Sequence, residues 1–138
     1  MNNKIYLENL ISNETLDSLK KYNLYDSSFE IINNDFMINI DACDFKTVVN
    51  NRLIVAYIDQ EVVNTKEVNV HLVKKIEEGS DYLGFIVVRG NHSTSIKICD
   101  EIIENVKKAL NTDISFIFSF DVDYKGQGIK ITSIITKR

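Results

Sequence analysis

The sequence predicts an α/β fold of the α+β two-layer sandwich type, in which helices pack on a mixed four-stranded sheet. Two runs, residues 53–58 and 83–88, are apolar at almost every position, as strands buried on both faces are. Residues 114–120 and 129–136 alternate in hydrophobicity, which indicates two further strands. Residues 96–110 carry apolar side chains at steps of three and four, which indicates an amphipathic helix. With one more helix, the expected order is strand, helix, strand, helix, strand, strand.

That further helix is expected between residues 64 and 79. Asn64 suits an N-cap, Glu67 follows it at the spacing of a capping box, and Gly79 supplies a stop. The apolar residues between these signals fall at helical spacing: Val68, Leu72, Val73 and Ile76. Since helical crossovers join parallel strands, we expect the first three strands to be parallel neighbours in a right-handed arrangement.

The last two strands are expected to form an antiparallel hairpin, because only the short polar turn of residues 121–128 separates them. The first of these strands has an aromatic face made of Phe116, Phe118 and Phe120. Few basic residues lie near this face in the sequence. We therefore expect it to belong to the core rather than to stack on nucleotide bases.

Residues 1–34 are expected to form a short helical N-terminal extension to a domain at residues 35–138. Their apolar residues suggest two short helices broken at Ser12-Asn13, followed by a further helical turn near Phe29. If this extension packs on the sheet, it covers one of the two faces of the sheet.

The composition excludes several classes of function. The chain has 138 residues, 44% of them hydrophobic, and a net charge of −4. Nucleic acid and anionic membranes need a basic face, so neither is expected as a partner. No apolar run approaches the roughly 20 residues of a membrane span, and the first residues lack the pattern of a secretory signal. Two cysteines make no disulfide framework, so a reducing, cytoplasmic location is expected.

The segment with the clearest chemical potential is residues 39–49, which contains Asn39, Asp41 and Asp44. One interpretation is structural: Asp41 caps a helix that runs to about Asn51, and Asp44 lies in its first turn, where the helix dipole favours negative charge. The other is functional: the two carboxylates and the Asn39 amide orient and activate a water molecule. The interpretations are compatible, because a cap also makes the loop rigid.

This segment resembles the synergy loop of the bacterial cell-division GTPase FtsZ, of the tubulin/FtsZ family. The family pattern is Asn-x-Asp-x-x-Asp, then an aliphatic residue and Lys-Thr-Val. Here Asn39, Asp41 and Asp44 occupy the polar positions and Phe-Lys-Thr-Val follows. Residues 126–136 resemble the closing strand of the same family. The resemblance covers residues 35–138 and implies a C-terminal domain of this family without the GTP-binding domain.

In that family, subunits stack head to tail, and the synergy loop of one subunit completes the active site on the GTP of its neighbour. The resemblance implies that Asp41 and Asp44 position and polarise the water that attacks the γ-phosphate, and that Asn39 helps to hold it. This chain lacks the family's glycine-rich phosphate loop, and no two of its glycines are adjacent. We therefore expect no cofactor on this chain and no GTP hydrolysis by it alone. The resemblance implies that GTP and Mg²⁺ are held by the partner subunit.

Three functions follow as expectations. The leading one is a stand-alone FtsZ C-terminal-like domain that docks its loop on the nucleotide face of a tubulin/FtsZ-type subunit, completing GTP hydrolysis or capping the filament. The alternative is a non-catalytic adaptor or scaffold protein that uses another face of the fold. A third is a small hydrolase that uses the Asp41/Asp44 pair in a pocket of its own. The expected partner is an FtsZ/tubulin-like GTPase subunit or another copy of the chain.

The histidines and cysteines give no separate site. His71, expected on a helix, and His92, expected in a turn, lack a partner at metal-ligand spacing, so both are expected to be solvated and no metal is expected. Cys43 is expected to pack rather than to act as a nucleophile, because the neighbouring carboxylates disfavour its thiolate. Cys99 lies in an apolar stripe and is expected in the core.

Overall fold

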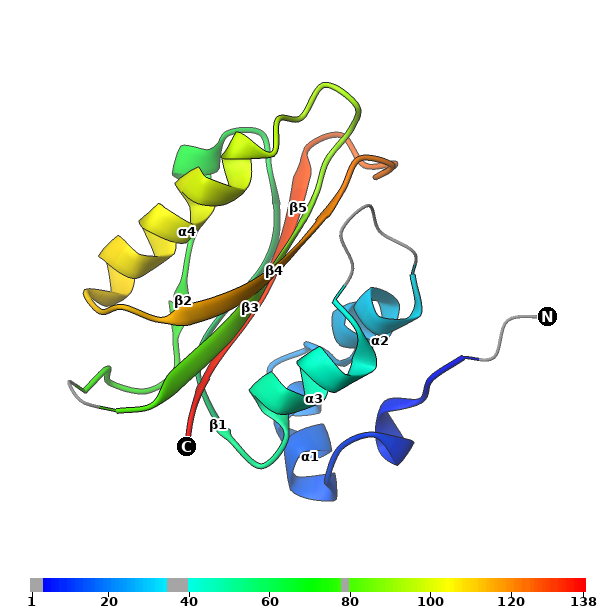
Figure 1. The fold of residues 1–138 in the computed structure, drawn as a ribbon, viewed down its shortest axis with the longest axis vertical. Helices are drawn as coiled ribbons and strands as arrows, with labels where there is room; N and C mark the ends of the chain where they lie inside the picture. The colour runs from blue at the N-terminus through cyan, green and yellow to red at the C-terminus, as the bar shows by residue number, and fades with distance from the viewer. Residues whose placement is uncertain (1–3, 35–39, 78–79) are drawn as a thin grey trace.

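A mixed sheet of five strands, in the order β2-β1-β5-β3-β4, forms the centre of the computed structural model, which describes residues 4–34, 40–77 and 80–138 (Figure 1). Helix α4 covers one face of this sheet, and α1, α2 and α3 lie on the other (Figure 1). The strands are β1 (Leu53–Val62), β2 (His71–Leu72), β3 (Tyr82–Arg89), β4 (Ser115–Asp121) and β5 (Ile129–Lys137). The helices are η1 (Leu7–Asn9), α1 (Asn13–Lys21), α2 (Tyr25–Asn33), α3 (Ala42–Val49), η2 (Thr65–Glu67) and α4 (Lys97–Leu110), η1 and η2 being 3-10 helices. Among the described helices, none is long and apolar enough to cross a membrane.

The sheet has one strand more than the sequence predicted, and its order differs. Strand β5 lies between β1 and β3 and is antiparallel to both, while β3 and β4 form a parallel pair. The expected hairpin of the last two strands is therefore wrong, and so is the expectation that the first three strands are all parallel neighbours. The physical reason for the central place of β5 is that it buries apolar side chains on both of its faces. Ile131, Ile134 and Ile135 of β5 are 0% exposed and face both layers, which an edge position would not provide.

The helix expected over residues 64–79 is also wrong. The described part of this stretch contains one 3-10 turn, η2, and the two-residue strand β2. Asn64 does cap η2, because its side chain accepts the N–H of Lys66 at 2.9 Å, but the helix does not continue. Gly79, the expected stop, lies outside the described residues.

Side-chain contacts explain why this stretch stays extended. The Gln60 side chain of β1 accepts the N–H of Asn69 at 2.7 Å and donates to the carbonyl of Glu67 at 3.3 Å, so it occupies backbone groups that a helix would pair internally. The β-branched Val68 and Val70 are half-buried against the core under α4. Such residues fit an extended strip better than a helix.

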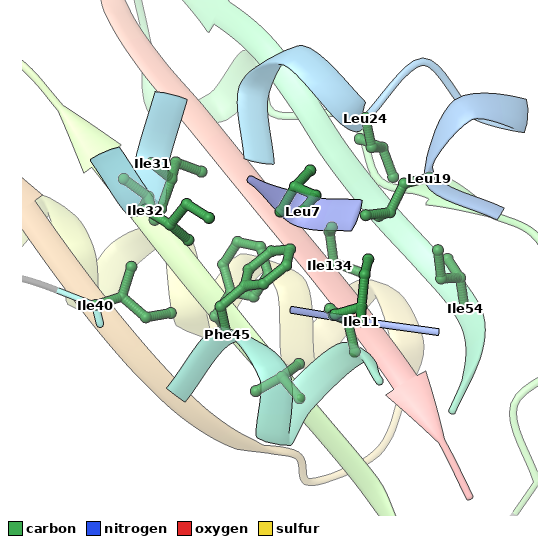
Figure 2. Packing of buried hydrophobic residues seen from close by; sticks show 14 of the residues in the cluster. Leu7, Ile11, Leu19, Leu24, Ile31, Ile32, Ile40, Phe45, Ile54 and Ile134 are labelled. Carbon is green, nitrogen blue, oxygen red and sulfur yellow. The ribbon is translucent and has the colours of Figure 1, made fainter. Parts of the chain in front are cut away.

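The N-terminal helices share a core with the sheet. Leu7, Leu19 and Leu24 are 0% exposed, and they pack in one cluster with Phe45 of α3 and Ile134 of β5 (Figure 2). The expected helical character of residues 1–34 is confirmed in η1, α1 and α2, and so is their packing on the sheet. The division of the chain at residue 34 stays a prediction.

The aromatic face of β4 belongs only partly to the core under α4. Phe120 is buried and Phe116 is half-buried in the cluster that contains Cys99 of α4. Phe118, by contrast, is 37% exposed. Among the described strands, β4 is the last in the order of the sheet.

Candidate functional site

The side chain of Asp41 caps helix α3, which begins at the next residue, Ala42. Asp41 has extended backbone (φ −87°, ψ 174°), and its Oδ1 accepts the N–H of Asp44 at 2.8 Å. In return, Asp44 Oδ2 accepts the N–H of Asp41 at 3.4 Å, which completes a capping box. The structural interpretation of this pair is confirmed, and both negative charges lie at the positive end of the helix dipole.

Two buried side chains fix α3 on the sheet. Phe45 and Val48 are at most 1% exposed, and the Phe45 ring lies 5.6 Å from the ring of Phe85 on β3. The Thr136 hydroxyl of β5 donates to the carbonyl of Val48 at 2.5 Å. Ile40, only 3% exposed, anchors the chain just before the cap. The two carboxylates therefore stand on a rigid support.

The far end of α3 is tied to α1. The side-chain oxygen of Asn50 accepts the N–H of Ser12 at 2.8 Å, and the Thr15 hydroxyl accepts the N–H of Asn51 at 2.9 Å. Each of these bonds joins the N-terminal end of α1 to the residues that follow α3. These two hydrogen bonds therefore fix α1 relative to the C-terminal end of α3.

A polar cluster on the sheet holds α2, the helix that precedes the candidate segment. The carboxylate of Asp59 on β1 accepts the Ser27 hydroxyl at 3.0 Å and lies 3.1 Å from the ammonium of Lys130. Glu30, one turn further along α2, forms an ion pair with Arg89 of β3. These contacts hold α2 on the sheet.

The two carboxylates of the capping box differ in exposure. Asp41 is exposed and Asp44 is half-buried. One oxygen of each accepts a backbone N–H, and the other has no partner within the described ranges. Asn39 lies outside the described residues, so its amide is not placed. A carboxylate pair of this kind can orient a water molecule and accept its proton when a second surface supplies the substrate.

Helix α3 also presents exposed residues, Cys43 and Lys46 among them, that the sequence analysis did not assign to the surface. Phe45, Val48 and Val49 face the core, so the positions between them face outward, and Cys43 and Lys46 are exposed. The expectation that Cys43 packs is therefore wrong. The helical spacing of the three buried residues is the signal that identifies both as surface positions.

The other candidate residues lie apart from α3. His71 lies on β2 rather than on a helix, with its ring stacked 5.0 Å from that of Tyr57, and His92 Nε2 lies 3.2 Å from Asp123 Oδ1. Both histidines are exposed, as predicted. Cys99 is buried, as predicted, and burial raises the pKa of its thiol to about 11. In the part of the chain that the structure describes, no three His, Cys, Asp or Glu side chains gather as around a metal ion.

The fold resembles that of FtsZ in solved structures, although no family model and no curated protein matches the sequence. A tryptophan-to-tyrosine variant of FtsZ from M. jannaschii matches with a TM-score of 0.57 and 18% identity, over 96% of this chain and 43% of that chain. An empty FtsZ dimer from M. jannaschii matches with a TM-score of 0.59 and 18% identity, over 96% of this chain and 41% of that chain.

This chain therefore spans less than half the length of these FtsZ chains, and it has an FtsZ C-terminal-like fold. The matched share of this chain is larger than residues 35–138 alone would provide, so it takes in part of the N-terminal helices.

Proposed function

We propose that this chain, with its FtsZ C-terminal-like fold, docks the N-terminal end of α3 on the nucleotide face of a tubulin/FtsZ-type GTPase subunit in the cytoplasm. Docking completes GTP hydrolysis on that subunit, or caps the filament when the loop does not align with the nucleotide. The partner holds the GTP and Mg²⁺, because this sequence has no glycine-rich phosphate loop.

The observation that carries the proposal is the capping box on a rigid, outward-facing helix end. The side chain of each aspartate accepts the backbone N–H of the other, and Phe45, the next residue of α3, is 0% exposed. A carboxylate pair that had to be ordered on binding would lose conformational entropy at that moment. Here the pair is ordered in advance, which favours docking by a preformed surface.

The proposal requires this chain only to position the water molecule that attacks the γ-phosphate. In phosphoryl transfer, catalysis consists mostly of positioning and electrostatic stabilisation. Asp41, exposed at the cap, orients the attacking water, and Asp44, half-buried beside it, holds the second hydrogen bond of that water. Asn39 donates its amide N–H to the same water. The partner subunit supplies every contact to the phosphates.

Amide variants separate this role from the structural one. Asp41→Asn and Asp44→Asn remove both charges but keep a side-chain oxygen for the cap. Wild-type chain, mixed with its cognate full-length polymerising GTPase, should raise GTP turnover or limit polymer mass, which phosphate release and light scattering report. The double variant should lose the stimulation by roughly 10²-fold or more.

A matched control changes charge on the other layer. Asp100→Asn with Glu104→Gln removes two exposed carboxylates from α4 and should leave the effect on the GTPase unchanged. A second readout uses the exposed Cys43, whose alkylation should slow when the partner covers α3. Equal behaviour of wild type and the Asp41/Asp44 double variant would contradict the proposal. If the Asp41/Asp44 double variant still binds the GTPase, and binding is lost only when residues on another face are changed, the adaptor function is favoured.

A further inference from the structure

Arg52 joins the end of α3 to two other segments of the chain. It lies between α3 and β1, and its side chain is only 9% exposed. Its Nε–H donates to the Thr136 hydroxyl of β5 at 2.9 Å, and a terminal N–H donates to the carbonyl of Asp81 at 2.7 Å. Because a guanidinium presents its donors in one rigid plane, these two bonds together hold it in one orientation.

The direction of the Thr136 hydroxyl follows from its two partners. A guanidinium only donates hydrogen bonds, so the Thr136 oxygen accepts from Arg52. The single hydrogen of the hydroxyl is then left for the carbonyl of Val48, which lies 2.5 Å away. Thr136 is 0% exposed, so bulk water does not compete for either bond. Arg52 therefore directs a buried hydrogen bond toward α3.

This hydrogen bond reaches α3 one turn after the capping box. In an α-helix the N–H of Val48 donates to the carbonyl of Asp44, and the N–H of Asp44 donates to Asp41 Oδ1 at 2.8 Å. The two bonds from α1 reach residues 50 and 51, beyond the last turn, whereas the Thr136 bond reaches the helix itself. Because α3 has only 8 residues, a shift of Val48 moves the first turn as well.

We propose that Arg52 is a positioning residue for the Asp41/Asp44 pair and acts through Thr136 and Val48. It sets where the first turn of α3 stands on the sheet, and so where the two carboxylates hold the attacking water. Its effect on the GTPase rests on the proposed function, whereas its effect on α3 is measured on this chain alone.

Amide exchange on the isolated full chain tests the effect on α3. Thr136→Val removes the hydroxyl and keeps the shape of the side chain. The amides of Asp44 and Phe45 should then exchange roughly three- to tenfold faster, as the loss of one hydrogen bond predicts, while the amide of Ile102 on α4 keeps its wild-type rate. Thr136→Ser keeps the hydroxyl and should restore slow exchange. No change in α3, or an equal change in α3 and α4, would overturn the proposal.

A double-mutant cycle tests whether Arg52 acts through Thr136. Arg52→Met keeps an apolar stem without a donor, and should speed exchange in α3 as Thr136→Val does. The double variant should exchange no faster than the faster single variant, because both changes remove the same link. The matched control is Asp81→Asn, which removes the carboxylate 3.4 Å from the guanidinium and keeps the carbonyl that Arg52 contacts. It should leave α3 unchanged. Additive effects, or an Asp81→Asn that behaves like Arg52→Met, would overturn the proposal.

Titration of the cognate GTPase tests the functional consequence. Arg52→Met leaves the exposed side chains of α3 in place, so the concentration that gives half of the maximal stimulation should stay within about twofold of wild type. The maximal GTP turnover should fall by roughly tenfold or more, because the water is held in the wrong place. A variant that stimulates fully at saturation would overturn the positioning role. A wild-type chain that leaves turnover and polymer mass unchanged would instead contradict the proposed function, and the exchange rates would still decide whether Arg52 positions α3.

Discussion

The Asp41 carboxylate links folding and proposed function at one side chain. Its Oδ1 accepts the N–H of Asp44 at the start of α3, and the exposed carboxylate can present its negative charge to a partner. The sequence identified this residue as an N-cap because capping is a local interaction, set by residues within one turn. It did not identify the exposure of Cys43, because that depends on which side of α3 meets the sheet.

Removing the cap should cost stability, whereas neutralising it should not. Asp41→Ala should lower the free energy of unfolding by about 1 kcal/mol, because the N–H of Asp44 loses its acceptor. Asp41→Asn retains an acceptor and should stay within about 0.5 kcal/mol of wild type. Urea titrations of the two variants check this. A loss as large in Asp41→Asn as in Asp41→Ala would show that the charge, not the hydrogen bond, is what stabilises α3.

Cys99 should make the protein sensitive to alkali. Its buried thiol has a pKa raised to about 11, so the folded chain holds this proton more tightly than the unfolded chain. The resulting stability is complete below about pH 9 and is lost as the pH rises through 11. We expect the free energy of unfolding to fall over this range, and to fall less in Cys99→Val. Parallel slopes for the two proteins, measured by urea titration at each pH, would contradict this.

At the scale of elements, the predictions from sequence spacing are confirmed where an element depends on its own residues. They are wrong where contacts with a distant segment decide the conformation. Helix α4 follows its apolar stripe, and β1 and β3 follow their apolar runs. The stretch after Asn64 has helical spacing too, but the side chain of Gln60 on β1 forms hydrogen bonds with its backbone at Glu67 and Asn69. These hydrogen bonds depend on β1, which no pattern within residues 64–79 contains. Spacing alone therefore could not separate a helix from an extended strip.

The packing of β3 against β4 should be sensitive to one added methyl group. A Cβ on Gly84 would lie 2.6 Å from the ring of Phe116. Gly84→Ala should therefore destabilise the fold by roughly 1–3 kcal/mol in denaturant titrations. Phe116→Leu, which removes the ring, should recover part of this loss when combined with Gly84→Ala. If the two losses simply add, the clash with the ring is not the cause.

At the scale of the molecule, the two layers should unfold together. Leu19 of α1 and Ile102 of α4 are both 0% exposed on opposite faces of one sheet. Leu19→Ala and Ile102→Ala should each lower the free energy of unfolding by about 2–5 kcal/mol. Amide exchange in both layers should then speed up equally in either variant. Faster exchange confined to α1 and α2 in Leu19→Ala would show that residues 1–34 unfold as a separate unit.

The topology was the least predictable property of the whole molecule. Strands β1, β3, β4 and β5 were visible in the sequence and β2 was not. The place of β5 depends on pairing across most of the chain, with Leu53 paired to Lys137 at its extreme. Nothing local to residues 129–136 distinguishes a central strand from one arm of a hairpin. The candidate site was easier to predict, since Asp41 and Asp44 lie within one helical turn of each other.

The central position of β5 also has a consequence during translation. Strands β1 and β3 leave the ribosome before the strand that joins them has been made. At 5–20 residues per second, synthesis from Arg89 to Lys137 takes on the order of seconds, during which their apolar side chains have no central strand to pack beside. The nascent chain therefore exposes the apolar side chains of β1 and β3 until β5 emerges, and this exposed surface favours aggregation during that time.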